Sequence, residues 1–198
     1  MPIHTYIATT SRIVSLIMAI LILFLGESIY AQDNPRPEAP GRLGLAVGAG
    51  RSFTPNSEMT FLNLTGLAMI DFQRVWPGKT PENIRLKAEF SPGVITHPNT
   101  RAIISSQVLV VVYFRSLSTA LFSPYLEFGA GGIYTDYRVE GQDSRFNFLL
   151  TGGPGIQFMS GPLKDYFASL RYHHISNGGF CNRNKALDSL FFSVGYLF

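Results

Sequence analysis

The apolar residues of this chain come in short alternating segments, and this pattern constrains the fold more than any other feature. After residue 31 the longest apolar run, VLVVVYF at 108–114, has seven residues, whereas a transmembrane helix needs roughly 20. Yet hydrophobic residues make up 46% of the chain and charged residues only 15%, with 19 glycines. Short apolar segments that alternate with small or polar residues are typical of strands. The pattern therefore predicts an all-β fold.

The N-terminus has the organisation of a secretory signal peptide. Arg12 precedes a short apolar run, and a small residue, Ala31, ends the segment. A charged residue, a short apolar stretch and a small residue at the cleavage point characterise such peptides. We therefore predict a signal peptide at 1–31, a flexible lead-in at 32–41 and one domain at 42–198. An uncleaved N-terminal anchor is the alternative.

Eight segments of the predicted domain have strand character, with joints rich in Gly, Pro, Asn and Asp between them. In an exported chain, eight alternating strands predict an antiparallel transmembrane β-barrel of the bacterial outer membrane, and the terminal Phe198 is typical of that class. A soluble lipocalin-like barrel, with its apolar face inward, is the alternative that alternation leaves open. The segments are 42–52, 60–74, 83–95, 102–116, 124–137, 144–159, 165–176 and 188–198.

Composition narrows the function classes. The net charge of +3 is too small to argue for nucleic acid, and Cys181, the single cysteine, excludes an intrachain disulfide and suits a passive loop thiol. No phosphate-cradling glycine loop and no metal-ligand spacing occurs, so we expect no cofactor and no metal. The acidic residues Asp136, Glu140 and Asp143 fit a solvated loop better than a cation site.

The strand at 165–176 determines which side chains face outward. Arg171 and His173 share one face, and because charge is costly toward lipid we expect both in the lumen. His174 and Ser176 then face outward. The outward apolar stripe of the last segment, continued back by two residues, reaches Asp188. Three groups of a hydrolytic site thus meet on one face at one end of the barrel.

These residue types match the roles of a serine esterase. Ser176 would be the nucleophile, His174 the base that takes its proton, and Asp188 the acid that orients the imidazole. If the chain begins on the periplasmic side, this site lies at the outer leaflet. A tetrahedral intermediate needs hydrogen-bond donors for its oxyanion, and the expected donors follow Ser176: Asn177, Asn184 and the amides near Gly178.

The motif R-Y-x-H-x-S-N at 171–177, followed by Asn184, Asp188 and the final strand, resembles the outer-membrane lipid A 3-O-deacylases of the PagL family. The resemblance extends more weakly over the domain, through PYLEFGAGG and FLLTGGPGIQF. It implies a membrane-embedded serine esterase that removes the 3-linked acyl chain of lipid A. The catalytic residues would then be His174 and Ser176, with asparagines on the oxyanion side at 177 and 184. The family's acid is usually glutamate, so Asp188, one methylene shorter, implies a looser triad unless the backbone register compensates.

The expected partners are lipopolysaccharide (lipid A) as substrate and outer-membrane lipid, with no nucleic acid; a homodimer is left open. Two other functions are also left open. One is a non-enzymatic small barrel that serves as an adhesin or a structural envelope protein. The other is palmitoyl transfer to lipid A, which needs a hydrocarbon cavity inside the barrel.

Overall fold

The computed structural model describes residues 41–54, 59–76, 81–136 and 141–198. The predicted signal peptide and the predicted lead-in up to residue 40 lie outside these ranges. Among the described residues, no helix has the length and apolarity needed to cross a membrane.

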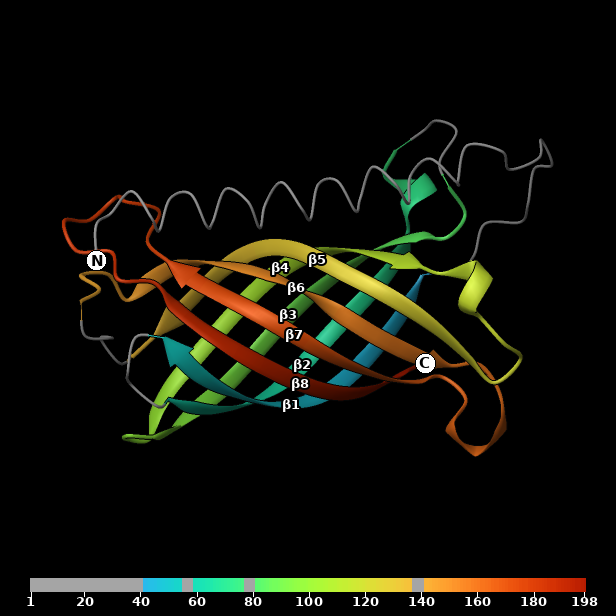
Figure 1. Ribbon diagram of the computed structural model, residues 1–198, viewed down its shortest axis with the longest axis horizontal. Helices are drawn as coiled ribbons and strands as arrows, with labels where there is room; N and C mark the ends of the chain where they lie inside the picture. Colours follow the sequence, from blue (N-terminus) through green and yellow to red (C-terminus); the bar gives the residue numbers. More distant parts are fainter. Residues whose placement is uncertain (1–40, 55–58, 77–80, 137–140) are drawn as a thin grey trace. The chain divides into compact units, whose positions relative to one another are not determined.

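Eight antiparallel strands form a closed barrel, in which each strand pairs with the next and β8 pairs with β1. Figure 1 shows the strands wrapping obliquely around the barrel. The predicted eight-stranded antiparallel barrel is confirmed, with strand ends within three residues of the predicted segments. The strands are β1 (Arg42–Thr54), β2 (Thr60–Asp71), β3 (Ile84–His97), β4 (Arg101–Tyr113), β5 (Phe122–Thr135), β6 (Phe146–Phe158), β7 (Tyr166–Ser176) and β8 (Leu187–Leu197).

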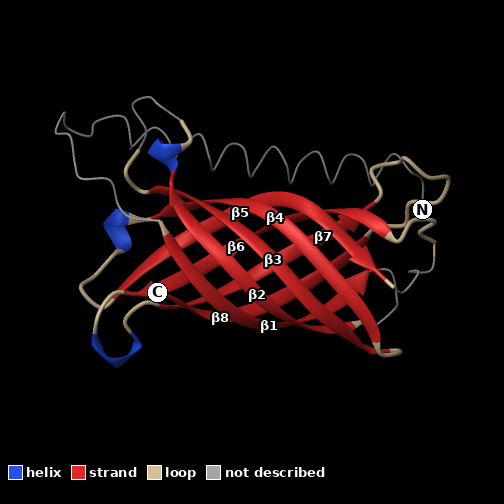
Figure 2. Cartoon of the chain, turned by 180° about the vertical axis from the view of Figure 1, so that it is seen from behind, coloured by secondary structure: helices blue, strands red, loops and turns tan. Residues whose placement is uncertain are grey.

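The two ends of the barrel differ. Short 3-10 helices join β2 to β3, β4 to β5 and β6 to β7: η2 (Phe72–Arg74), η3 (Arg115–Leu117) and η4 (Gly161–Leu163). Figure 2 shows them gathered at the end where β8 finishes, which we call the turn end. At the opposite end, which we call the loop end, residues 177–186 connect β7 to β8. We refer to this connection as the closing loop.

The outward face is apolar, and its large aromatic side chains gather near both ends. In β8, Leu190, Phe192 and Val194 are exposed while the residues between them are buried. Aromatic side chains at both borders of an apolar band are the arrangement of membrane barrels. Most exposed aromatic residues of the strands follow this arrangement: Phe53, Tyr134, Phe146, Phe148 and Tyr172 toward the loop end, and Tyr166, Tyr196 and Phe198 toward the turn end, while Phe90 and Phe192 are exposed in the middle of their strands.

The middle of the lumen holds a network of buried charges. Arg171 donates two hydrogen bonds to the carboxylate of Glu89, at 2.8 and 2.9 Å, and a third to Glu127 at 2.6 Å. Lys87 pairs with the same two carboxylates. Gln107 also donates to Glu89, at 2.8 Å. Two cations therefore neutralise two anions across β3, β5 and β7, and the network fills the lumen.

Apolar clusters lie on either side of this network. At the turn end, Phe167 packs among small and aliphatic residues. Toward the loop end, His173 is buried and stacks on Phe191, with ring centroids 5.0 Å apart, as the strand parity predicts. The residues of the loop-end cluster are Met59, Ile95, Ile103, Ile133, Leu149, Ile175 and Leu187.

We expect Arg171→Met to lower the free energy of unfolding by about 3–5 kcal/mol, because it leaves buried carboxylates with too few donors. Unfolding in detergent micelles, followed by circular dichroism or by gel mobility, measures the change. The control is Arg115→Met, which removes an exposed pair with Glu82 and should cost no more than about 1 kcal/mol. Equal losses in the two variants would contradict a stabilising role for the network.

Candidate active site

The candidate site lies at the loop end, where β7 finishes and β8 begins. The strand register places His174 directly opposite Asp188, and the imidazole Nδ1 lies 2.7 Å from the carboxylate Oδ1. The side chain of His174 is 29% exposed and that of Asp188 is 12% exposed. The pair is therefore largely shielded from solvent, yet one edge of the imidazole remains accessible.

The contact with Asp188 determines which imidazole nitrogen is available. An ionised carboxylate only accepts hydrogen bonds, so Nδ1 carries the proton and donates it. In the neutral ring, Nε2 then keeps its lone pair. Within the described residues Nε2 of His174 makes no hydrogen bond. It is thus the nitrogen that can take a proton from another group.

Ser176 follows His174 by two residues on β7, so the two side chains point to the same, outward side of the sheet. Ser176 is partly buried, and its hydroxyl has no hydrogen-bond partner among the described residues. A serine and a base often come into hydrogen-bond contact only when substrate is present. Two side chains on one face of a strand, two residues apart, are compatible with a nucleophile and its base.

Asn177 holds the closing loop together. Its amide Nδ2 donates to the carbonyl of Arg183 at 2.9 Å, and its Oδ1 accepts from the N–H of Gly179 at 2.9 Å. Its backbone N–H donates to Oδ1 of Asn184 at 2.8 Å. Asn177 is only 3% exposed and orders the closing loop, while the oxyanion-donor role expected from the sequence stays a prediction.

Two other groups near Ser176 remain as hydrogen-bond donors. Gly178 has a φ of +64°, a left-handed conformation that glycine adopts without strain. Its N–H and the Nδ2 of Asn184 make no hydrogen bond within the part of the chain that the structure describes. Both are therefore available to an oxygen that carries negative charge.

Tyr172 also belongs to the candidate site, although the sequence analysis did not include it. Its hydroxyl donates to Oδ1 of Asp188 at 2.7 Å, the same oxygen that His174 contacts. Strand alternation alone predicts only that Tyr172 is one of several aromatic residues that face outward. The signal available in the sequence was its position, two residues before His174 on the same face.

The acidic loop residues and the cysteine considered in the sequence analysis do not lie in the candidate site. Asp143 pairs with Arg183 at 2.9 Å and Asp136 with Arg145 at 3.4 Å, while Glu140 lies outside the described residues. Cys181 is a free, partly exposed thiol of the closing loop. Among the described residues, no three His, Cys, Asp or Glu side chains converge as metal ligands.

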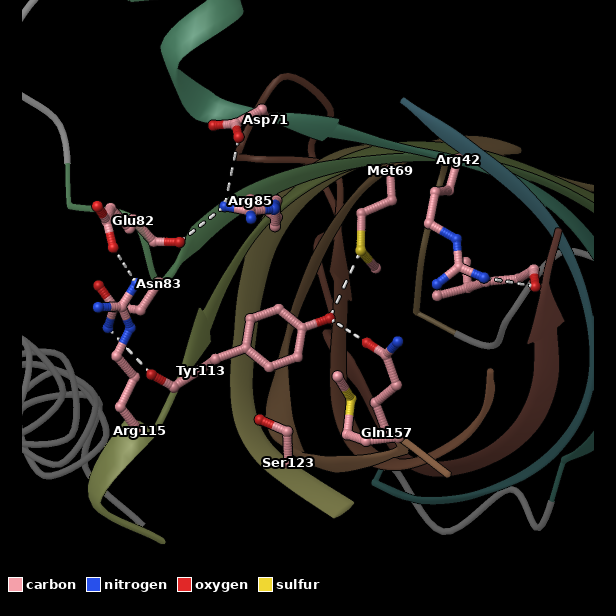
Figure 3. A pocket seen from close by; sticks show the side chains of 12 residues that line it. Arg42, Met69, Asp71, Glu82, Asn83, Arg85, Tyr113, Arg115, Ser123 and Gln157 are labelled. Carbon is pink, nitrogen blue, oxygen red and sulfur yellow. Dashed lines mark hydrogen bonds and ion pairs between the residues drawn. The ribbon is translucent and has the colours of Figure 1, made fainter. Parts of the chain in front are cut away.

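A cavity of about 320 Å³ opens at the turn end, far along the strands from His174. Figure 3 shows Tyr113 reaching across it toward Gln157, whose Oε1 accepts from the tyrosine hydroxyl at 2.6 Å. Each of its arginines pairs with a carboxylate: Arg42 with Asp165 at 2.9 Å, Arg85 with Asp71 at 3.7 Å, and the exposed Arg115 with Glu82. No imidazole and no thiol lines it, so this cavity does not coincide with the candidate site.

Comparisons with known proteins identify the family. A profile described as lipid A 3-O-deacylase (PagL) matches residues 72–197, which include the whole cluster at the loop end. The chain belongs to this family. The resemblance seen in the sequence is therefore confirmed, and as a PagL-family protein the chain is an ester hydrolase of the lipid A deacylase type.

Solved structures agree with the fold of this PagL-family chain. The crystal structure of the outer membrane enzyme PagL superposes with a TM-score of 0.58 at 19% identity, covering 77% of this chain and 98% of that one. Neisserial surface protein A gives a TM-score of 0.57 at 11% identity, covering 82% and 100% respectively. No curated protein matches the chain by sequence.

We expect Asn177→Ala to loosen the closing loop, because two partly buried hydrogen bonds of its side chain are lost. Trypsin should then cut after Arg183 or Lys185 about tenfold faster in the detergent-solubilised barrel, as followed by mass spectrometry of the fragments. Asn182→Ala is the matched control, since Asn182 is exposed on the same loop. Equal cleavage rates in both variants would show that Asn177 does not order the loop.

Proposed function

We propose that this PagL-family chain is a serine esterase that hydrolyses the 3-O-linked acyl chain of lipid A at the outer leaflet of the outer membrane. Ser176 is the nucleophile, His174 the general base and Asp188 the orienting acid. The observation that carries the proposal is the 2.7 Å contact of His174 Nδ1 with Asp188, one step along the outward face from a serine.

Acylation begins when the hydroxyl of Ser176 attacks the carbonyl carbon of the 3-O-linked ester. Nε2 of His174 takes the hydroxyl proton as the bond forms. Asp188 holds the imidazole in the tautomer that can accept this proton and stabilises the imidazolium that results. When the tetrahedral intermediate collapses, the sugar 3-oxygen leaves with the proton from Nε2, and the acyl group remains on Ser176.

In deacylation water replaces Ser176 as the nucleophile, and His174 again acts as the base. A water molecule attacks the acyl-serine carbonyl while Nε2 of His174 removes its proton. The second intermediate collapses, the proton returns to the oxygen of Ser176, and a free 3-hydroxy fatty acid is released. In both steps the N–H of Gly178 and the amide of Asn184 supply hydrogen bonds to the oxyanion.

The position of the cluster on the outer wall supports a lipid substrate. Leu170 and Leu190 are about half exposed on the same face as His174 and Ser176, so an acyl chain lying along the barrel would present its ester at the loop end. β1 starts and β8 finishes at the turn end. An exported chain whose N-terminus stays in the periplasm therefore carries the cluster to the outer leaflet.

Filling of the lumen favours hydrolysis over palmitoyl transfer. Transfer needs an interior cavity for a hydrocarbon chain, but Arg171 and its partners occupy the middle of the lumen. The cavity next to the loop-end apolar cluster measures only about 20 Å³, room for about one water molecule. The larger cavity of about 320 Å³ lies at the turn end among arginine and carboxylate side chains, which suit a hydrocarbon chain poorly.

We expect Ser176→Ala and His174→Ala each to abolish release of a 3-hydroxy fatty acid from lipopolysaccharide while the barrel still folds, because each removes a reacting group. Mass spectrometry of lipid A, with and without expression, measures the result. Loss of an acyl chain indicates the deacylase, gain indicates palmitoyl transfer, and no change indicates a non-enzymatic barrel. His97→Ala is the control, since His97 is exposed at the end of β3 and should leave activity intact. Full activity of both site variants would refute the assignment.

A further inference from the structure

We infer that Tyr172 is a positioning residue of the esterase, which orients the carboxylate of Asp188 through its hydroxyl and thereby makes the short acid effective. The inference rests on the proposed function, because it assigns Asp188 the part of orienting acid. Nothing in strand alternation requires a hydroxyl at this outward position, where phenylalanine or leucine would face lipid equally well.

The geometry joins three side chains at a single oxygen. Oδ1 of Asp188 accepts from the Tyr172 hydroxyl at 2.7 Å and lies 2.7 Å from Nδ1 of His174. Tyr172 and His174 are neighbours on one face of β7, and Asp188 stands opposite His174 on β8. The two donors therefore approach the carboxylate from successive positions along the neighbouring strand.

Packing keeps the tyrosine ring over the acid. The ring of Phe53, from β1, lies with its centroid 6.2 Å from that of Tyr172, tilted by 43°. Thr54, the next residue of β1, pairs with Asp188 in the strand register. Tyr172 thus leans from β7 across β8 toward β1, and its hydroxyl ends at the carboxylate rather than in the surrounding medium.

The burial of Asp188 explains why a second donor matters. The side chain is 12% exposed at the border of an apolar surface, where water supplies few hydrogen bonds. A carboxylate there is costly unless donors satisfy it. With His174 alone, the acid would rotate about its short side chain. With the Tyr172 hydroxyl on the same oxygen, the carboxylate is held facing Nδ1.

The hydroxyl also acts on the charge that develops during the reaction. When His174 takes the proton of Ser176 at Nε2, the ring becomes an imidazolium beside Asp188. A donor that stabilises the negative carboxylate keeps the proton of Nδ1 on the imidazole. Tyr172 therefore acts on the rate of the chemical step and leaves substrate binding to other side chains.

The other outward tyrosines near the barrel ends show that this contact is specific. Tyr166 lies on the same strand and the same face, at the turn end, and stacks with Tyr196 at a centroid distance of 5.0 Å. Neither hydroxyl donates to a carboxylate within the described residues. Tyr166 therefore provides a matched comparison, an outward tyrosine with a ring contact but without the acid.

The test compares two substitutions of Tyr172 in the full-length barrel, reconstituted with lipopolysaccharide. Tyr172→Phe keeps the ring and its contact with Phe53 but removes the hydroxyl, whereas Tyr172→Leu removes both. If the hydroxyl positions Asp188, both variants lose roughly tenfold to a hundredfold in kcat, the effect of one hydrogen bond to a charged group. The KM of Tyr172→Phe stays as in the wild type and the barrel still folds, and Tyr166→Phe retains full kcat.

Other results overturn the inference. If Tyr172→Phe keeps wild-type kcat while Tyr172→Leu loses activity, the ring acts by packing alone. If Tyr172→Phe raises KM with kcat unchanged, the hydroxyl binds substrate and does not position the acid. Ser176→Ala, assayed in parallel, distinguishes a failure of the role of Tyr172 from a failure of the esterase mechanism. An inactive Ser176→Ala with an unimpaired Tyr172→Phe removes only the role of Tyr172, whereas an active Ser176→Ala removes the proposed esterase mechanism as a whole.

Discussion

The ion network around Arg171 determines which side chains of β7 point into the lumen and which point outward. Its guanidinium binds the Glu89 carboxylate through two nitrogens and Glu127 through a third. If Arg171 turned outward, Lys87 alone would have to neutralise these two buried anions. Side chains on a strand alternate with a period of two. With Arg171 inside, His174 and Ser176 must be outside, and a slip of β7 by one residue would bury both.

The same network explains how a site on the outer wall coexists with a closed barrel. An eight-stranded barrel is just wide enough for side chains to fill it, and here the filling is ionic in the middle and apolar toward each end. Ile175 and Leu187, which flank the His174–Asp188 pair on the inside, belong to the apolar cluster beneath it. The proposed reacting groups therefore rest on a packed wall, and in the proposed mechanism the substrate approaches from the lipid side.

Alternation allowed much of this to be predicted from the sequence. The eight strands, the lumenal position of Arg171 and His173, and the shared face of His174 and Ser176 follow from a period of two and the cost of charge toward lipid. Glu89 and Glu127 could not be identified as partners of Arg171, because they come from β3 and β5, and such pairing depends on barrel closure. The hydrogen bonds of Asn177 within the closing loop could not be predicted either, because a loop has no repeating pattern from which contacts can be inferred. Tyr172 was assigned to the correct face, but the direction of its hydroxyl depends on a rotamer and on Phe53.

In the proposed triad Asp188 stands where the family's acid is usually glutamate, and the strand register compensates for its shorter side chain. A carboxylate one methylene shorter reaches a base only if the backbone brings the two strands into direct opposition, and the register does so for His174 and Asp188. The shorter arm has fewer rotatable bonds, so less conformational entropy is lost when it is held. It also reaches fewer donors, and Tyr172 supplies one that lies within its range. The substitution is therefore compatible with a working orienting acid, provided that the hydrogen bond from β7 accompanies it.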